Sequence, residues 1–233
     1  MTKKLTAAER VKGNAYPGRG IAVGMSEKGE IYLVYFIMGR SENSRNRVLV
    51  IQDDTLMTRP FDESKVKDPS LIIYNAMRRV GDRIVLTNGD QTDTAAEALL
   101  AGGDFFAALG TRTYEPDAPN YTPRISAMID LAKGAYSMSI LRRTSSGECE
   151  KGEYVYPFEK GVGRLIHTYE GDGNPLPSFV GAPREIAVTG DLDDFATALW
   201  DALDEDNKIA LFARSIHPIS GEIETRLFNK NRG

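Results

Sequence analysis

The sequence predicts an α+β fold in which antiparallel β-sheets are the main component. Three observations support this prediction: short apolar runs recur along the 233-residue chain, polar turn-like segments separate them, and convincing helical patterns are few. The order of the runs is not that of the alternating strands and helices of a parallel sheet. We therefore expect two antiparallel sheets covered by helices.

The first third of the chain contains the clearest hairpin. Residues 1–14 form a polar leader with room for one short helix, and residues 15–233 are expected to form a single domain. Apolar residues 20–24 and 30–38 flank Ser26-Glu27-Lys28-Gly29, whose Lys-Gly tip suits a tight turn. These two segments are therefore predicted to be neighbouring strands, and another buried strand is predicted at 48–51.

A second hairpin and the first helices follow. Residues 71–77 and 83–86 flank a tight turn at Val80-Gly81-Asp82. A helix is predicted from Thr92 or Asp93 to Ala101, because short polar side chains accept hydrogen bonds from the free N–H groups of a first turn. The later predictions are a short helix at 102–109, strands at 124–130, 135–143, 152–157, 164–169 and 185–188, a helix at 191–203, and a closing hairpin of 209–216 with 222–228.

Composition narrows the kind of partner. The net charge is −4, so a broad basic surface for nucleic acid is not expected, and a small anion is the expected partner. The longest apolar run, 31–38, is far shorter than the roughly 20 residues of a membrane helix. The N-terminus also lacks the apolar core of a secretory signal, so a cytoplasmic protein is expected.

Several sites are excluded by the residues that would have to form them. Cys149 is the single cysteine, and His167 and His217 lie fifty positions apart, so neither a disulfide nor a metal site is expected. The glycines of 18–24 are followed by a predicted strand, whereas a dinucleotide-binding loop opens a helix. Thr2 would become an N-terminal nucleophile if Met1 were removed, but a polar leader is not the buried strand that such a nucleophile begins.

The most unusual segment is Met38-Gly39-Arg40-Ser41-Glu42-Asn43-Ser44-Arg45-Asn46-Arg47, which carries three arginines between the apolar runs 31–37 and 48–51. We interpret it as the point where two central strands emerge. Arginine side chains held there would suit recognition of a phosphate or a carboxylate, because a guanidinium group can bind two oxygens at once.

Other polar segments at predicted strand ends complete a pattern. Five segments occur in order: Tyr16-Pro17-Gly18-Arg19-Gly20-Ile21, Gly39-Arg40-Ser41 with Asn46-Arg47, Asp68-Pro69 leading to Tyr74-Asn75, Asn88-Gly89-Asp90-Gln91-Thr92-Asp93-Thr94, and Thr122-Pro123-Arg124-Ile125. Together they resemble the archaeal-type inosine monophosphate (IMP) cyclohydrolase family, over about residues 16–130. The last hundred residues are similar only in general character.

The resemblance implies a fold and an activity. The fold would be a four-layer αββα sandwich of the N-terminal-nucleophile-hydrolase kind, without the self-processing nucleophile. The activity would be the last step of purine biosynthesis, in which 5-formamidoimidazole-4-carboxamide ribonucleotide closes to IMP with loss of water. The resemblance implies no metal or other cofactor, and it implies a homo-oligomer.

The resemblance also implies site residues. The catalytic candidates are Arg40 for the oxyanion, Tyr74 as hydrogen-bond or proton donor, and Glu115 for proton transfer. The substrate-binding candidates are Arg19, Arg45, Arg47 and Arg124, of which the last three are assigned to the 5′-phosphate, and Asn75, Asn88, Thr92 and Asp93, which are assigned to the ribose or carboxamide.

Two departures from the family pattern leave other functions open. The arginine segment is longer here, and Gln91 stands where archaeal members have histidine. A purine-nucleotide-binding module without catalysis and an N-terminal-nucleophile amidohydrolase are the alternatives.

Overall fold

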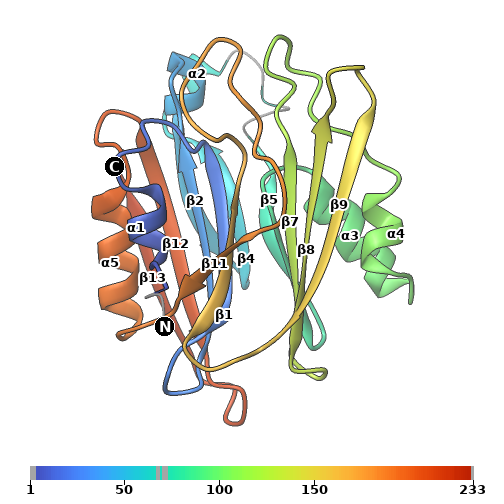
Figure 1. The fold of residues 1–233 in the computed structure, drawn as a ribbon, viewed down its shortest axis with the longest axis vertical. Helices are drawn as coiled ribbons and strands as arrows, with labels where there is room; N and C mark the ends of the chain where they lie inside the picture. Colours follow the sequence, from blue (N-terminus) through green and yellow to red (C-terminus); the bar gives the residue numbers. More distant parts are fainter. Residues whose placement is uncertain (1–3, 67–68, 70–72, 232–233) are drawn as a thin grey trace.

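The computed structural model describes residues 4–66, 69 and 73–231. Within them, two antiparallel sheets face each other, and a few helices pack on their outer sides (Figure 1). The predicted α+β class with two antiparallel sheets is confirmed. No helix in the described part of the chain is both long and apolar enough to cross a membrane.

The first sheet has six strands in the order β11-β10-β1-β2-β12-β13. Its strands are β1 (Arg19–Met25), β2 (Ile31–Met38), β10 (Val162–His167), β11 (Arg184–Ala187), β12 (Lys208–Ile216) and β13 (Ile223–Asn229). The predicted hairpin of β1 and β2 is confirmed, with Ala22 opposite Val34. All of β2 is buried, because its two faces are covered by the second sheet and by helices.

The second sheet has seven strands in chain order. They are β3 (Arg47–Gln52), β4 (Thr55–Pro60), β5 (Asn75–Val80), β6 (Arg83–Thr87), β7 (Arg124–Asp130), β8 (Ala135–Arg143) and β9 (Cys149–Pro157). The hairpin of β5 and β6 is confirmed, although β5 begins only at Asn75. Residues 68, 71 and 72 of the predicted segments lie outside the described residues.

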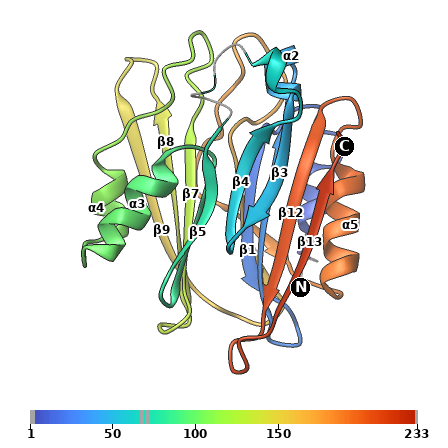
Figure 2. The same ribbon diagram turned by 180° about the vertical axis from the view of Figure 1, so that it is seen from behind.

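Helices cover both outer faces, as the views from the two sides show (Figures 1 and 2). Helices α1 (Ala7–Val11) and α5 (Leu192–Ala202) pack together on the six-stranded sheet, and α3 (Gln91–Leu100) and α4 (Phe105–Leu109) pack on the seven-stranded sheet. A short helix α2 (Glu42–Arg45) and a 3₁₀ turn (Glu63–Lys65) lie in connections. The helix of the polar leader is therefore part of a packed layer, with Ala7 and Val11 buried.

Three apolar clusters hold these layers together. The largest lies between the sheets and contains alternate residues of β2, including Leu33, Tyr35 and Ile37. The intervening residues, such as Val34 and Phe36, belong to a second cluster under α1 and α5. A small third cluster lies under α3 and α4. Since strand side chains alternate between faces, β2 supplies two cores at once.

The structure corrects two predictions, one about the arginine segment and one about the start of α3. β3 is the edge strand of the second sheet, so the arginine segment does not join two central strands but passes from the inner strand β2 of one sheet to the edge of the other. Its middle forms α2, with Ser41 as the N-cap. Helix α3 begins at Gln91 after Asp90, so neither Thr92 nor Asp93 is its N-cap.

Candidate functional site

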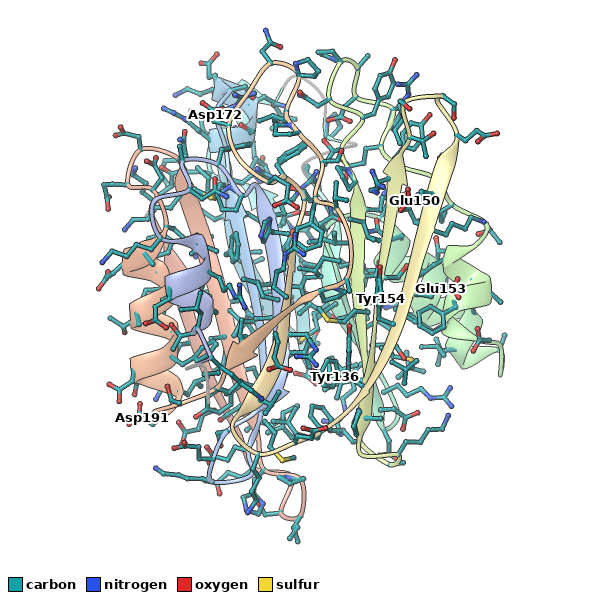
Figure 3. All side chains as sticks on the ribbon, in the orientation of Figure 1. Tyr136, Glu150, Glu153, Tyr154, Asp172 and Asp191 are labelled. Atoms are coloured by element: carbon teal, nitrogen blue, oxygen red, sulfur yellow. The ribbon has the colours of Figure 1, made fainter. Side chains whose placement is uncertain are left out.

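A pocket of about 250 Å³ opens at the end of the molecule where β1 begins and β2 ends. Its walls come from both sheets and from the loops around them, and Figure 3 places Asp172 beside α2 at this end. The lining residues are Tyr16, Gly18, Arg19, Met38, Arg40, Ser41, Asn43, Ser44, Arg47, Glu115, Asp117, Asn120, Thr122, Tyr169 and Leu176.

The inner wall holds a buried ion pair. Arg19 at the start of β1 donates from Nη2 to Glu115 Oε2 at 3.0 Å and from Nη1 to the carbonyl oxygen of Asn88 at 3.0 Å. Only 10% of the Arg19 side chain and 4% of the Glu115 side chain are exposed, so water screens this pair little. Burial raises the pKa of Glu115 above its ordinary value, although Arg19 beside it acts in the opposite direction.

Arg19 is itself held in its charged form. Burial alone would lower its pKa, but Glu115, followed by the phenols of Tyr74, Tyr35 and Tyr169, raises that pKa well above its ordinary value. The pair thus presents to the pocket a permanent cation and a carboxyl group that takes up a proton more readily than an exposed glutamate.

Arg124 lies behind this pair and is fully engaged. Its guanidinium group donates to Asp90 Oδ1 at 2.6 Å, to Gln91 Oε1 at 2.7 Å and to the carbonyl oxygen of Thr113 at 2.9 Å. A Cβ atom at Gly89 would lie 2.9 Å from Arg124 Nη1 and 3.5 Å from Glu115 Oε1, so glycine allows the close approach here. Arg124 is absent from the pocket lining and supports the Glu115 region from behind.

Tyr74 is also placed behind the wall. It is 6% exposed, and its hydroxyl lies 2.7 Å from the hydroxyl of Tyr35 on β2. It contributes to the electrostatic surroundings of Arg19 but does not line the pocket. The structure therefore brings Tyr74 near the predicted site without exposing it there.

The three arginines of the segment 38–47 have different surroundings. Arg40 lines the pocket, forms an ion pair with Asp172 and lies over the ring of Tyr16, 5.0 Å from its centroid. Arg47 lines the pocket from the start of β3, is 4% exposed and donates to the carbonyl oxygens of Ser44 and Met38.

Arg45 faces away from the pocket. It donates instead to the carbonyl oxygen of Gly39 and to Asn207 Oδ1. Asn43 is an addition to the predicted set, because it lines the pocket and its buried Oδ1 has no hydrogen-bond partner among the described residues. An unpaired buried acceptor is costly, so a ligand donor would be favoured there.

The remaining predicted residues are not brought to the pocket. Asn75 and Arg78 bind the carboxylate of Asp93 on α3. Thr92 lies 2.7 Å from the hydroxyl of Thr87, and Asn88 uses its amide on Pro123, Ile125 and Gln91. None of Asn75, Asn88, Thr92 and Asp93 lines the pocket.

Comparison with known protein families places the pocket residues within a family match. A family model described as IMP cyclohydrolase-like protein matches residues 16–220. The chain belongs to this family. All pocket-lining residues of this IMP cyclohydrolase-like chain fall inside the matched region.

Individual relatives agree with the family match. A protein named IMP cyclohydrolase from Methanococcus maripaludis is 36% identical over 149 residues, which cover 60% of this chain and 72% of the relative. Another of the same name, from Methanopyrus kandleri, is 34% identical over 49% of this chain and 59% of the relative. A third, from Haloquadratum walsbyi, is 27% identical over 220 residues, which cover 92% of this chain and 98% of the relative.

Several lining residues were not among the sequence candidates. Tyr16 and Thr122 lie in polar segments noted in the sequence, but Asp117, Tyr169 and Leu176 were not singled out. Tyr169 and Leu176 belong to the β10–β11 connection, about fifty residues beyond Thr122 in the chain. Only an aromatic and two acids in Tyr169-Glu170-Gly171-Asp172 could have indicated this segment.

Among the described residues, no group of three or more histidine, cysteine, aspartate or glutamate side chains is arranged to hold a metal ion. The groups that can interact with a ligand in the pocket are the arginines, carboxylates, phenols, hydroxyls and amides described above.

Proposed function

We propose that this protein is an IMP cyclohydrolase that closes 5-formamidoimidazole-4-carboxamide ribonucleotide to IMP and water in purine biosynthesis. The match to the IMP cyclohydrolase-like family over residues 16–220 supports this function. The observation that carries it is the buried Arg19–Glu115 pair on the wall of a pocket that also contains Arg40 and Arg47. A single pocket then offers groups for an anion and a group for proton transfer.

The proposed fold relationship is the αββα sandwich of N-terminal-nucleophile hydrolases. The helices on the outer sides of both facing sheets support this relationship (Figure 1). Thr2, the one residue considered as a nucleophile, lies outside the described residues. The poor sequence context of Thr2 supports the proposal that the reaction uses pocket side chains.

Ring closure needs three things from the pocket. The carboxamide nitrogen must be held against the formyl carbon, charge on the formyl oxygen must be stabilised, and the departing hydroxyl must receive a proton. Glu115 is proposed to move the proton, and its raised pKa supports this role, because a larger share of such a carboxyl group is protonated, and can donate its proton, near neutral pH. Arg40 is proposed to break its ion pair with Asp172 and to stabilise the oxyanion.

Tyr74 is proposed to donate a hydrogen bond, and its position defines how. Because it does not line the pocket, it acts on the reaction through the field around Arg19. Tyr74→Phe tests this route by its effect on turnover.

The substrate phosphate is proposed to bind next to α2. Arg47, Ser41 and Ser44 line this side of the pocket, whereas Arg45 and Arg124 are engaged elsewhere. Arg19 is proposed to contact the substrate near Glu115. Asn88 and Thr92 are proposed to support the loop that carries Gly89, and Asn75 and Asp93 to hold β5 against α3, because none of the four lines the pocket.

The test is direct conversion. The purified protein is mixed with the formamido ribonucleotide, and the hypoxanthine chromophore is followed in the ultraviolet, with Glu115→Gln as the control. Turnover that depends on Glu115 is expected. Binding of IMP without turnover would instead identify a nucleotide-binding module, and loss of Met1 with activity on amides would identify an amidohydrolase. Sedimentation of the same sample tests the proposed homo-oligomer.

A further inference from the structure

One hydrogen-bonded chain on the pocket wall has no role in the function proposed so far. Tyr169, Thr122 and Asp117 all line the pocket. The Tyr169 hydroxyl is hydrogen-bonded to Thr122 Oγ1, which in turn donates to Asp117 Oδ2. Tyr169 and Thr122 are 4% and 2% exposed, so these bonds are shielded from water.

The direction of this chain follows from its last member. A carboxylate can only accept hydrogen bonds, and a hydroxyl has one proton to donate. Since Thr122 donates its proton to Asp117, it must accept from Tyr169. The phenol oxygen of Tyr169 then has its proton directed at Thr122 and its free lone pair available to the pocket.

The surroundings keep this direction fixed. Asp117 Oδ1 accepts from the backbone N–H of Thr122 at 2.7 Å, which fixes the orientation of the carboxylate. The ring of Tyr169 is stacked on that of Tyr16, with centroids 5.9 Å apart. Burial raises the pKa of Tyr169 above its ordinary value, so the phenol keeps the proton that it donates to Thr122.

We propose that Tyr169 accepts a hydrogen bond from the carboxamide N–H₂ of the substrate, and that Thr122 and Asp117 are positioning residues that fix Tyr169 as an acceptor. This inference rests on the proposed function. The carboxamide nitrogen is the attacking atom, and an acceptor on one of its N–H bonds holds it in place for attack on the formyl carbon. In the product the same nitrogen is N1 of hypoxanthine and still carries one hydrogen.

Substitution of Asp117 by asparagine tests the polarity without changing the shape. The oxygen of the new amide is held at the Oδ1 position by the N–H of Thr122, so its NH₂ group occupies the Oδ2 position and donates to Thr122. Thr122 must then donate to Tyr169, and Tyr169 presents its proton to the pocket. The acceptor becomes a donor.

The measurement is the ratio of dissociation constants for two nucleotides. IMP carries a hydrogen on N1, whereas adenosine monophosphate has an acceptor there. Wild-type protein is expected to prefer IMP. Asp117→Asn is expected to shift the ratio about 10-fold towards adenosine monophosphate, because a donor on Tyr169 matches the N1 acceptor of adenosine monophosphate and opposes the N1 hydrogen of IMP. Tyr169→Phe is expected to shift the ratio part of the way, since it removes the acceptor without adding a donor.

Controls and outcomes separate this inference from the function on which it rests. Asp193→Asn, on the outer helix α5, should leave the ratio unchanged. An unchanged ratio in Tyr169→Phe overturns the inference, even if Asp117→Asn does not fold. A shift towards IMP in Asp117→Asn also overturns it, because Tyr169 would then contact the 6-substituent. If wild-type protein neither converts the formamido ribonucleotide nor binds IMP, the proposed function itself is wrong.

Discussion

The Arg19–Glu115 pair should respond differently to loss of each partner. Glu115→Gln removes the negative charge beside the buried Arg19 cation and leaves it only uncharged acceptors, the carbonyl oxygen of Asn88 and the amide oxygen of the new glutamine. Because the two side chains are only 10% and 4% exposed, this change should cost about 3–5 kcal/mol of unfolding free energy. In this variant the site itself should add no pH dependence of stability between about 5 and 9, since neither glutamine nor arginine titrates there.

Loss of the cation should have a pH-dependent cost. In Arg19→Met, Glu115 escapes the penalty of a buried charge by taking up a proton, so the variant should be least destabilised near pH 4. The sign follows from a folded-state pKa that is raised above the unfolded value of about 4.3. Stability is then fully present below that value and is lost as pH rises through the raised pKa.

Urea unfolding of both variants at several pH values measures this difference. Glu150→Gln is a matched control, because Glu150 lies on the edge strand β9 (Figure 3) and pairs with Arg142 of β8, and its side chain is 48% exposed. Its loss should cost less than about 1 kcal/mol. Turnover of Glu115→Gln should fall by about 100-fold or more if Glu115 transfers the proton. A pH-independent loss in Arg19→Met, or near-normal turnover in Glu115→Gln, would refute the reasoning.

Three further expectations follow. Arg47→Ala should raise KM in steady-state kinetics, whereas Arg45→Ala should change KM less, because Arg45 does not line the pocket. Equal effects of the two substitutions would contradict the assignment of Arg47 to the substrate phosphate. Gly24→Ala should lower the unfolding free energy by about 1–3 kcal/mol, as measured by urea unfolding, because the added Cβ would lie 2.5 Å from Gly163 Cα in the paired strand. Gly171→Ala is the control and should be tolerated, because its added Cβ would lie 3.7 Å from the nearest atom. Burial lowers the pKa of His167, so stability should decline as pH falls below about 6.5, and this decline should be weaker in His167→Phe.

The strands that the sequence predicts are those with strong local signals. Residues 20–24 and 30–38 have long apolar runs around a Lys-Gly turn, and β7 and β8 have the bounds that were predicted. Strand β4 was missed because its turn is formed by Asp53 and Asp54 in the left-handed region, without the glycine that usually indicates such a turn. The strand itself ends in Pro60, which weakens its pattern further.

The site was predictable only where its residues carry unusual local patterns. Arg40, Arg47 and Glu115 lie in polar segments next to apolar runs, and all three line the pocket. Arg124 and Tyr74 have equally distinctive surroundings in the sequence but face inward, and side-chain direction at a strand end depends on pairing that one sequence does not reveal. Tyr169 comes from a distant loop, so only the folded chain brings it to Thr122.

The chain passes from β2 of one sheet through α2 to β3 of the other, so the pocket beside α2 links ligand binding to the contact between the two sheets. A ligand in this pocket touches residues that belong to both sheets, so it favours only states in which the sheets remain face to face. Binding should therefore slow amide hydrogen exchange in β1 and β2 of one sheet and in β3 of the other to a similar extent. Protection confined to one sheet would mean that the two halves open independently around the ligand.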